Sequence, residues 1–258
     1  MKQTIIVTGA AKRIGAAILA HLARAGHHVV LHYHQSEQAA LALADELRER
    51  GAAVETIFAD LARPGAAAAL VLAASERAGG VITGLVNCAS HFELDTPGAM
   101  SRSLFDHAVQ ANLLAPVELT TALARQPGLT HGSVVNLLDQ KLANLNPDFF
   151  SYTLSKSALE AATTMLAQSL APLVRVNAVS PGITLASHDQ TAEEFAAVAR
   201  ENLLGQPVAI GDIARAVEFL LTTPSVTGQN IFVDCGQRFV TRSRDVMFAT
   251  RPQSGANG

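Results

Sequence analysis

Tyr152 and Lys156 are the residues whose types and spacing most directly suggest chemistry. Being four positions apart, they lie on one face of a helix, one turn from each other. Because an ammonium group favours a nearby phenolate, we expect Lys156 to lower the pKa of Tyr152 from its usual value of about 10. A phenol tuned in this way can donate or accept a proton in catalysis. On spacing alone, an ordinary pair on a helix surface fits equally well, so other segments must decide.

A glycine-bearing loop near the start of the chain is the second chemical signal. Thr8-Gly9-Ala10-Ala11-Lys12-Arg13-Ile14-Gly15 follows a strand-like run over 4–8 and precedes a helix expected over 16–25. Backbone N–H groups and the positive end of the helix dipole would bind a diphosphate there. The loop therefore predicts a dinucleotide site, with cofactor contacts from Gly9, Arg13, Ile14 and Gly15.

The end of the second strand-like run, 28–33, distinguishes between the two nicotinamide cofactors. A site for NAD usually has a carboxylate here, whereas this chain has His32-Tyr33-His34-Gln35-Ser36. Lys12 and Arg13 supply positive charge nearby, and a 2′-phosphate needs cations and donors. We therefore predict NADPH, contacted by Arg13, His32, His34 and Ser36, although one histidine can equally be an ordinary polar residue of the strand end. Because these histidines surround the cofactor strand, we do not expect a metal site.

Strand-like and helix-like runs alternate along the whole chain. Further strands are expected over 54–59, 84–88, 133–138, 175–179 and 230–233, with helices from Ser36 to about 50, up to about 78, and over about 20 residues on either side of the fifth strand. The pattern predicts an α/β fold, a doubly wound Rossmann-type sheet of seven parallel strands in a single domain. We assign residues 1–240 to this domain and 241–258 to a tail that is poorly ordered or used in subunit contacts.

Composition excludes several classes of function. The chain has 258 residues, of which 49% are hydrophobic and 16% charged, and a formal net charge of −3. A slightly negative net charge does not indicate binding to nucleic acid or to anionic lipid. No apolar run approaches the ~20 residues needed to span a membrane. Cys88 and Cys235 lack metal-ligand spacing and are expected to be buried free thiols. With no secretory signal, these features predict a soluble cytoplasmic protein.

An ordered set of short motifs extends the pattern over essentially the whole chain. It comprises Asp60-Leu61, Asn87-Cys88-Ala89-Ser90, Asn112-Leu113-Leu114-Ala115-Pro116, Ser180-Pro181-Gly182 and Val226-Thr227-Gly228-Gln229. Together with the glycine loop and Tyr152/Lys156, this set resembles the short-chain dehydrogenase/reductase family. The resemblance implies cofactor contacts from Asp60, Leu61, Asn87, Ala89, Ser90, Tyr152, Lys156, Pro181, Gly182 and Thr184.

The resemblance also implies roles in proton transfer. Lys156 would bind the nicotinamide ribose, and Asn112 would hold a water that links Lys156 to solvent. Alternatively, Asn112 is a buried helix residue that compensates for the backbone N–H missing at Pro116.

Two departures from the family pattern narrow the resemblance. Arg13 stands where the family has a glycine, and Asp139, thirteen residues before Tyr152, replaces the usual catalytic serine. These features resemble the pteridine reductases and the bacterial dihydromonapterin reductases, as does Phe92, at a position implied to stack on the pterin. Gln35 replaces an arginine common in pteridine reductases, which weakens the predicted 2′-phosphate site.

Asp139 follows an apolar strand at the edge where parallel sheets bind ligands. Desolvation there would raise its pKa and allow it to pass a proton to a ring nitrogen, although a simple capping role at Gln140-Lys141 is the alternative. Phe92 offers an aromatic face that would stack on a conjugated ring or simply pack in the core. Ser90 would donate to the cofactor or the pterin, and His188, Asp189 and a helix over 191–202 would form a flap.

The sequence thus predicts NADPH-dependent reduction of a pteridine, with Asp139, Tyr152, Lys156 and Asn112 as catalytic residues and Ser90, Phe92, Asp139 and Tyr152 in contact with substrate. A carbonyl reductase, such as one acting on a 3-oxoacyl thioester, and a non-catalytic NADP-binding regulator remain alternatives. The resemblance implies a homotetramer, and Ala158, Ala161, Ala162 and Ala167 would allow close contact between helices.

Overall fold

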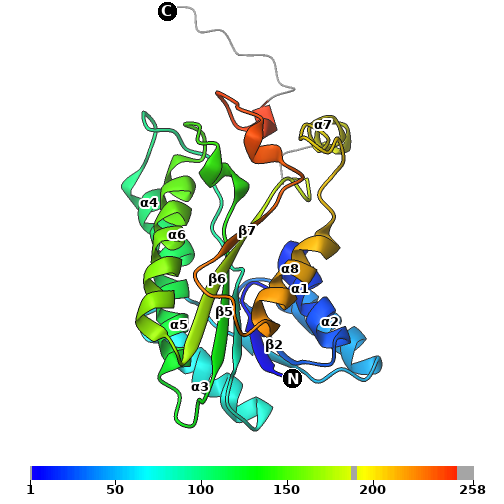
Figure 1. Cartoon of the computed structure of the whole chain (residues 1–258), viewed down its shortest axis with the longest axis vertical. Coiled ribbons are helices and arrows are strands. Elements are labelled where there is room, and N and C mark those ends of the chain that lie inside the picture. Colours follow the sequence, from blue (N-terminus) through cyan, green and yellow to red (C-terminus); the bar gives the residue numbers. More distant parts are fainter. Residues whose placement is uncertain (1, 187–190, 249–258) are drawn as a thin grey trace, which may run out of the picture.

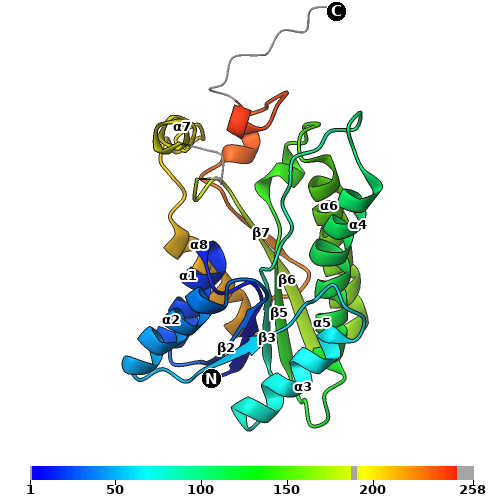
Figure 2. The same cartoon turned by 180° about the vertical axis from the view of Figure 1, so that it is seen from behind.

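The computed structural model describes residues 2–186 and 191–248, which form one parallel sheet covered by helices on both faces (Figures 1 and 2). The sheet of the described residues has seven strands in the order β3-β2-β1-β4-β5-β6-β7, and each strand pairs with its neighbours in parallel. The strands are β1 (Thr4–Val7), β2 (His28–Tyr33), β3 (Val54–Phe58), β4 (Gly84–Asn87), β5 (Gly132–Leu137), β6 (Val174–Pro181) and β7 (Asn230–Val233). The predicted doubly wound, seven-stranded α/β architecture is confirmed.

Helices form two layers, one on each face of the sheet (Figure 2). One layer holds α1 (Arg13–Arg24), α2 (Glu37–Glu49) and α8 (Ile210–Thr222). The other holds α3 (Ala66–Ala78), α4 (Arg102–Val109), α5 (Ala115–Ala124) and α6 (Phe150–Leu170). The short helix α7 (Ala192–Val198) lies apart from both layers, near the C-terminal segment.

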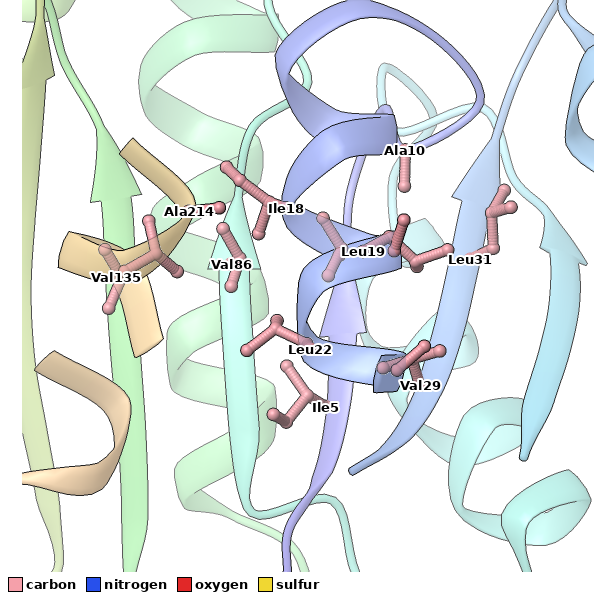
Figure 3. Close-up of a cluster of buried hydrophobic side chains, with 14 of the residues drawn as sticks. Ile5, Ala10, Ile18, Leu19, Leu22, Val29, Leu31, Val86, Val135 and Ala214 are labelled. Atoms are coloured by element: carbon pink, nitrogen blue, oxygen red, sulfur yellow. The ribbon is translucent and has the colours of Figure 1, made fainter. Parts of the chain in front are cut away.

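The core beneath α1 shows why these apolar patterns give this arrangement (Figure 3). Ile18, Leu19 and Leu22 recur at helical spacing and pack against the sheet, where Ile5 and Leu31 are also fully buried. Burial of each such side chain contributes about 1.5–3 kcal/mol. The position of α1, and hence of the loop that precedes it, is fixed by this contact.

The sequence-based boundaries differ from the structure mainly at element ends. The helical segment before β5 is interrupted by a π-helical turn at Gln110–Leu114, just before Pro116, whose ring carries no N–H. Ser36 stands at the N-cap of α2, as predicted, but its side chain makes no capping hydrogen bond. Helix α8 was not predicted.

The sheet order places β1 beside β4, where the direction of winding reverses. In doubly wound folds, ligands bind at the carboxyl ends of the strands near such a switch point. The loops that follow β1, β4, β5 and β6 converge there, and they carry most of the predicted site residues. No helix in the described residues is long and apolar enough to cross a membrane.

Candidate active site

A cavity of about 200 Å³ lies beyond the carboxyl ends of the strands. It collects residues from the β1–α1 loop, the segments after β4, β5 and β6, helix α6, and the C-terminal segment. The lining residues are Arg13, Ile14, Phe92, Leu138, Asp139, Gln140, Lys141, Tyr152, Pro181, Gly182, Ile183, Thr184, Leu185, Asp245 and Val246. Eight of them were predicted as site residues: Arg13, Ile14, Phe92, Asp139, Tyr152, Pro181, Gly182 and Thr184.

Tyr152 and Asp139 meet inside this cavity. The Tyr152 hydroxyl donates a hydrogen bond of 2.9 Å to Oδ2 of Asp139. Burial raises the pKa of Asp139 above its usual range, and the charge of Asp245 raises it further, whereas the hydrogen bonds from Lys141 and Tyr152 oppose this shift. A carboxyl group that holds its proton more tightly in a cavity is suited to act as an acid.

Asp139 also has the capping role that was weighed as the alternative. Its Oδ1 accepts a 2.8 Å hydrogen bond from the backbone N–H of Lys141, at the start of a 3₁₀ turn over Gln140–Ala143. The two carboxylate oxygens thus serve different partners. Capping and contact with Tyr152 are combined in one side chain.

The expected effect of Lys156 on Tyr152 is wrong for this structure. The pKa of Tyr152 lies well above 10, because burial and the neighbouring charge of Asp139 both disfavour the phenolate. Lys156 Nζ donates a 2.7 Å hydrogen bond to the Leu137 carbonyl and lies 5.8 Å from the centre of the Tyr152 ring. Burial lowers the pKa of Lys156 to about 8. Since Tyr152 is 7% and Lys156 3% exposed, the pair is not on an ordinary helix surface.

Asn112 lies in the π-helical turn and is fully buried. Its Oδ1 accepts from Ser90 Oγ at 3.0 Å and from His91 N at 2.8 Å. Its Nδ2 donates to the His91 carbonyl and to Ser155 Oγ, both at 2.9 Å. The side chain therefore joins the loop after β4 to the helix that carries Tyr152, and its predicted part in a water relay stays a prediction.

Phe92 forms an aromatic wall of the cavity and is not a core residue. Its ring is 47% exposed, stacks on Phe149 at 4.2 Å between centroids, and meets Tyr152 edge-on at 4.8 Å. Buried Asp95 accepts from the Ser151 backbone N–H and hydroxyl, which fixes the start of α6 to the same loop. The aromatic face of Phe92 is thus available beside the catalytic candidates.

The β1–α1 loop has the close backbone approach that a diphosphate site needs. Gly9 has φ +62°, and a Cβ there would lie 2.8 Å from the Ala89 Cα. A Cβ on Gly15 would lie 2.4 Å from the Gly9 carbonyl oxygen. Thr8 Oγ1 accepts from the N–H groups of Cys88 and Ala89 at 3.0 Å, which joins this loop to the one after β4. The close contact of the two loops thus lies at the start of α1, where a helix N-terminus would bind a diphosphate.

His32 has a different role from the predicted cofactor contact. Its side chain is buried, Nδ1 accepts from Gly9 N at 3.2 Å, and Nε2 lies 3.0 Å from the Ala59 carbonyl, to which it donates. Its own carbonyl accepts from Ala10 N at 3.1 Å. Burial lowers the pKa of His32 to about 4, so the ring is neutral at physiological pH. Both ring nitrogens are used within the protein, and His32 supports the loop from beneath.

Arg13 also departs from its predicted role. Its φ of +56° lies in the left-handed region that favours glycine, the residue usual here in the resembled family. The guanidinium donates to the Ala186 carbonyl at 2.9 Å and lines the catalytic cavity. It is therefore directed towards the segment after β6, and not towards the end of β2, where a ribose 2′-phosphate would be recognised.

The remaining predicted cofactor residues fall into two groups. Some are used inside the fold: Asn87 Nδ2 donates to Asn136 Oδ1 at 2.8 Å, Ser90 donates to Asn112, and Asp60 accepts from Ala62 N at 3.1 Å. Leu61 packs against the core, and Ser36 caps no N–H group. His34 is exposed at the end of β2, 6.0 Å from the Phe58 ring. The cofactor contacts of all these residues stay predictions.

Several site residues were missed by sequence reasoning. Lys141, Asp245 and Val246 line the cavity although Asp245 lies 104 residues after Lys141 along the chain. No spacing rule brings the C-terminal segment to the catalytic helix, so no signal in the sequence identified it. The described part of the predicted tail, 241–248, thus lies over the site, while the domain boundary at 240 stays a prediction.

The predicted flap is described only in part. His188 and Asp189 lie outside the described residues. The helix predicted over 191–202 is α7, which has a capping box formed by Thr191 and Glu194 and ends at Val198.

Cys88 and Cys235 are free thiols, both only partly buried, and burial raises the pKa of Cys88 to about 11. Among residues 2–186 and 191–248, no group of three or more histidine, cysteine or acidic side chains is arranged to hold a metal ion.

Comparison with known proteins places this site in a family. The family model described as enoyl-(acyl carrier protein) reductase matches residues 9–238. The chain belongs to the short-chain dehydrogenase/reductase family of oxidoreductases. The family predicted from the motifs is therefore confirmed.

Individual members of the short-chain dehydrogenase/reductase family align over most of the chain. The structure of FolM alternative dihydrofolate reductase 1 from Brucella suis, in complex with NADP, is 39% identical, with a TM-score of 0.89 and coverage of 93% of this chain and 96% of that one. A dihydromonapterin reductase of Klebsiella pneumoniae is 25% identical over 236 residues, 90% of this chain and 95% of the relative. A chloroplastic NADPH-dependent aldehyde reductase of Arabidopsis thaliana is 31% identical over 253 residues, 90% of this chain and 92% of the relative.

Proposed function

We propose that this oxidoreductase uses NADPH to reduce a C=N bond of a pteridine. The observation that carries the proposal is the hydrogen bond between Tyr152 and Asp139 beside the exposed ring of Phe92, all within one cavity. A carboxyl group at this place suits protonation of nitrogen, whereas a carbonyl reductase of this family commonly uses a serine hydroxyl to polarise oxygen. The relatives named for dihydromonapterin and dihydrofolate reduction support the same substrate class.

A dinucleotide fits the residues that form the crevice. The backbone at Gly9 and Gly15 leaves no room for a side chain, which keeps N–H groups of the loop and of the start of α1 accessible to a diphosphate. Exposed His34 and partly buried Ser36 would contact the 2′-phosphate, and Pro181–Gly182 would lie beside the nicotinamide. When bound, NADPH supplies the hydride. The NADP complex of the Brucella suis relative supports this choice of cofactor.

The polar residues of the cavity supply the proton. Asp139 and Tyr152 are both buried, and burial raises the pKa of each. Asp139 would pass its proton to the ring nitrogen that gains charge, and the Tyr152 hydroxyl would stabilise the resulting carboxylate by its hydrogen bond until water returns a proton to it. Lys156 would bind the hydroxyls of the nicotinamide ribose. Asn112 would keep helix α6 and the loop after β4 in contact with each other.

Phe92 would position the substrate. A flat conjugated ring stacks well on an exposed phenyl face, and Phe149 behind Phe92 keeps that face in place. Since Tyr152 meets Phe92 edge-on, a ring stacked on Phe92 would lie close to the Tyr152 hydroxyl. Stacking and proton transfer are therefore compatible in one orientation.

We also propose a homotetramer located in the cytoplasm. Met165 is 67% and Leu154 42% exposed on the outer face of α6, and Leu114 of the π-helical turn is 42% exposed, which supports helix pairing there. Of the small residues expected at such an interface, Ala167 is buried in the core and is unavailable, while Ala161 is exposed. Light scattering should give about four chains per particle, and Ala161→Arg should reduce this number. A monomer at micromolar concentration would contradict the proposal.

One panel of substrates tests the proposed reaction. NADPH oxidation by the pure protein should be measured with dihydrobiopterin, dihydromonapterin, dihydrofolate, an aldehyde and a 3-oxoacyl thioester. We expect turnover with at least one of the first three and little with the last two. Efficient reduction of the aldehyde or the thioester alone would identify a carbonyl reductase, as the Arabidopsis relative is named.

A further inference from the structure

The loop that leads from β4 to α4 is attached to helix α6 on both sides of Phe92. On the earlier side, Asn112 Oδ1 accepts from the backbone N–H of His91 at 2.8 Å. The amide nitrogen of the same Asn112 donates to Ser155 Oγ of α6 at 2.9 Å. The residue directly before Phe92 is therefore connected to the helix that carries Tyr152.

Asp95 makes the second attachment, three residues after Phe92. Its carboxylate accepts from the Ser151 backbone N–H at 3.0 Å and from the Ser151 hydroxyl at 2.5 Å. Its own carbonyl accepts from the backbone N–H of Phe150 at 3.3 Å. Asp95 is only 4% exposed and Ser151 1%, so water does not compete for these bonds. One loop residue is thus held against the first turn of α6.

This contact caps α6 from a distant part of the chain. The helix begins at Phe150, and the residue before it, Phe149, makes no side-chain capping bond. The first N–H groups of a helix have no partner within it, and a carboxylate is favoured at that end by the helix dipole. Asp95 supplies acceptors for two of these groups from 56 positions before Ser151. The cap therefore also determines where the loop lies.

The two attachments are made to one face of α6, beside Tyr152. Ser151 and Ser155, which receive them, are four residues apart and so one helical turn apart, and both are buried. The helix itself is held by the core, where Leu159 packs with Ala178 of β6. Because α6 is fixed in this way, the loop is the part that the two attachments position.

Phe92 depends on this positioning. Its ring is 47% exposed, stacks on Phe149 and meets Tyr152 edge-on at 4.8 Å between centroids. Because nearly half of the ring faces solvent, packing alone constrains it weakly. The backbone on both sides of Phe92 must therefore be held for the ring to keep its place beside the Tyr152 hydroxyl.

We infer that Asp95 is a positioning residue for substrate binding: by capping α6 it keeps the Phe92 ring at the distance from Tyr152 that a stacked pteridine requires. This inference rests on the proposed function. Asp95 does not line the cavity, so it acts through Phe92 and not by contact with the substrate.

The first test is the KM of Asp95→Ala for 7,8-dihydropterin at saturating NADPH. We expect KM to rise by about 2–12-fold, as for loss of the aromatic stack. The kcat should stay close to that of the parent, because Tyr152 and Asp139 keep their hydrogen bond. A purely structural role would lower the amount of active enzyme and the melting temperature, but it would not change KM.

A double variant tests whether Asp95 acts through Phe92. Contributions of independent residues add as free energies, so independent effects on KM would multiply. If Asp95 only positions Phe92, then Phe92→Ala/Asp95→Ala should have the same KM as Phe92→Ala alone. A KM equal to the product of the two single effects would contradict the inference.

Three further variants serve as rescue, second test and control. Asp95→Asn can still accept from the Ser151 N–H and can donate to the Ser151 hydroxyl, so its KM should stay close to that of the parent. Ser151→Ala removes the hydroxyl bond alone and should raise KM less than Asp95→Ala; it decides the question if Asp95→Ala does not fold. Ser101→Ala removes the cap of α4, where Ser101 Oγ accepts from Leu104 N, and should leave KM unchanged.

The outcomes separate this inference from the proposed function. If Phe92→Ala raises KM but Asp95→Ala, or Ser151→Ala in its place, has the KM of the parent, Asp95 is only a helix cap and pteridine reduction stands. If the parent reduces no pteridine of the substrate panel, the proposed function is overturned, and this inference with it.

Discussion

The Tyr152 hydroxyl lies 2.9 Å from Oδ2 of Asp139, which joins the catalytic helix α6 to the residue that follows the end of β5. The second oxygen of Asp139 accepts the Lys141 N–H at 2.8 Å, so the carboxyl group has little freedom to rotate. Both groups are buried, and burial raises the pKa of each. The two groups therefore form a buried, hydrogen-bonded pair at one side of the cavity.

The pH dependence of turnover should report Asp139. A general acid is active while protonated, and burial raises the pKa of Asp139, so activity should persist to higher pH than an exposed carboxyl would allow and then fall as pH rises. The Tyr152 hydrogen bond lowers this pKa, and Tyr152→Phe should therefore shift the alkaline limb of the residual activity to higher pH. The measurement is kcat/KM for a dihydropterin across pH. An alkaline limb that stays in place in Tyr152→Phe would assign it to another group.

Phe92 should contribute to substrate binding and little to cofactor binding. Loss of an aromatic stack costs about 0.5–1.5 kcal/mol beyond the lost area, so Phe92→Ala should raise KM for the pteridine by at least about 2–12-fold. Phe219→Ala on α8 is a matched control, because that ring is 48% exposed but does not line the cavity. Steady-state kinetics with saturating NADPH would check this, and an equal effect of both substitutions would remove Phe92 from the site.

The features that could be predicted from the sequence are mostly those determined by residues close together along the chain. The order of strands and helices follows from local apolar patterns and glycines, and β2 and β7 were predicted to the residue. The family resemblance, through the spacing of thirteen residues, placed Asp139 and Tyr152 in one site, and in the structure a hydrogen bond joins them. Helix α8 was missed even though its apolar face packs on α1.

Other features depend on tertiary contacts that no spacing encodes. His32 was taken for a cofactor residue, since its type and place fit that role, yet its ring is buried beneath Gly9. The Tyr152 pKa was predicted from the spacing to Lys156, but burial and Asp139 outweigh the ammonium, which bonds to a carbonyl instead. Asp245 reaches the cavity through contacts between distant parts of the chain, among them the bonds of Arg244 and of its own N–H to Asp148.

His32 should make both the phosphate loop and overall stability sensitive to acid. Its pKa is about 4 in the folded protein and 6.5 when unfolded, so the unfolded state takes up the proton first. Stability should therefore fall as pH decreases from about 6.5 to 4, by up to about 3 kcal/mol from this group. Urea unfolding at several pH values would show this. His32→Leu should lack this pH-dependent contribution. It should also bind NADPH more weakly at pH 7, because Gly9 N and the Ala59 carbonyl lose their partner. A variant with the pH dependence and the NADPH affinity of the parent would contradict the role assigned to His32.

Arg13 and His34 should differ in their effect on cofactor preference. Because the Arg13 guanidinium lines the cavity and bonds to Ala186, Arg13→Ala should weaken NADPH and NADH to a similar degree. His34 is exposed at the end of β2, so His34→Ala should weaken NADPH and leave NADH nearly unchanged, by about 10-fold for one lost bond to phosphate. Titration of both variants with both cofactors is the measurement. A selective loss of NADPH in Arg13→Ala would restore the role predicted from sequence.

The central claim is that Asp139 gives the proton that completes pteridine reduction, and the turnover of Asp139→Asn tests it most directly. Asparagine can still accept the Lys141 N–H, so the 3₁₀ turn should be retained, but it has no proton to give. With saturating NADPH, and with NADPH affinity equal to the parent's, we predict that turnover of a dihydropterin falls by about 10²–10⁴-fold. Turnover within a few-fold of the parent would show that Asp139 only caps the turn, and would contradict the account.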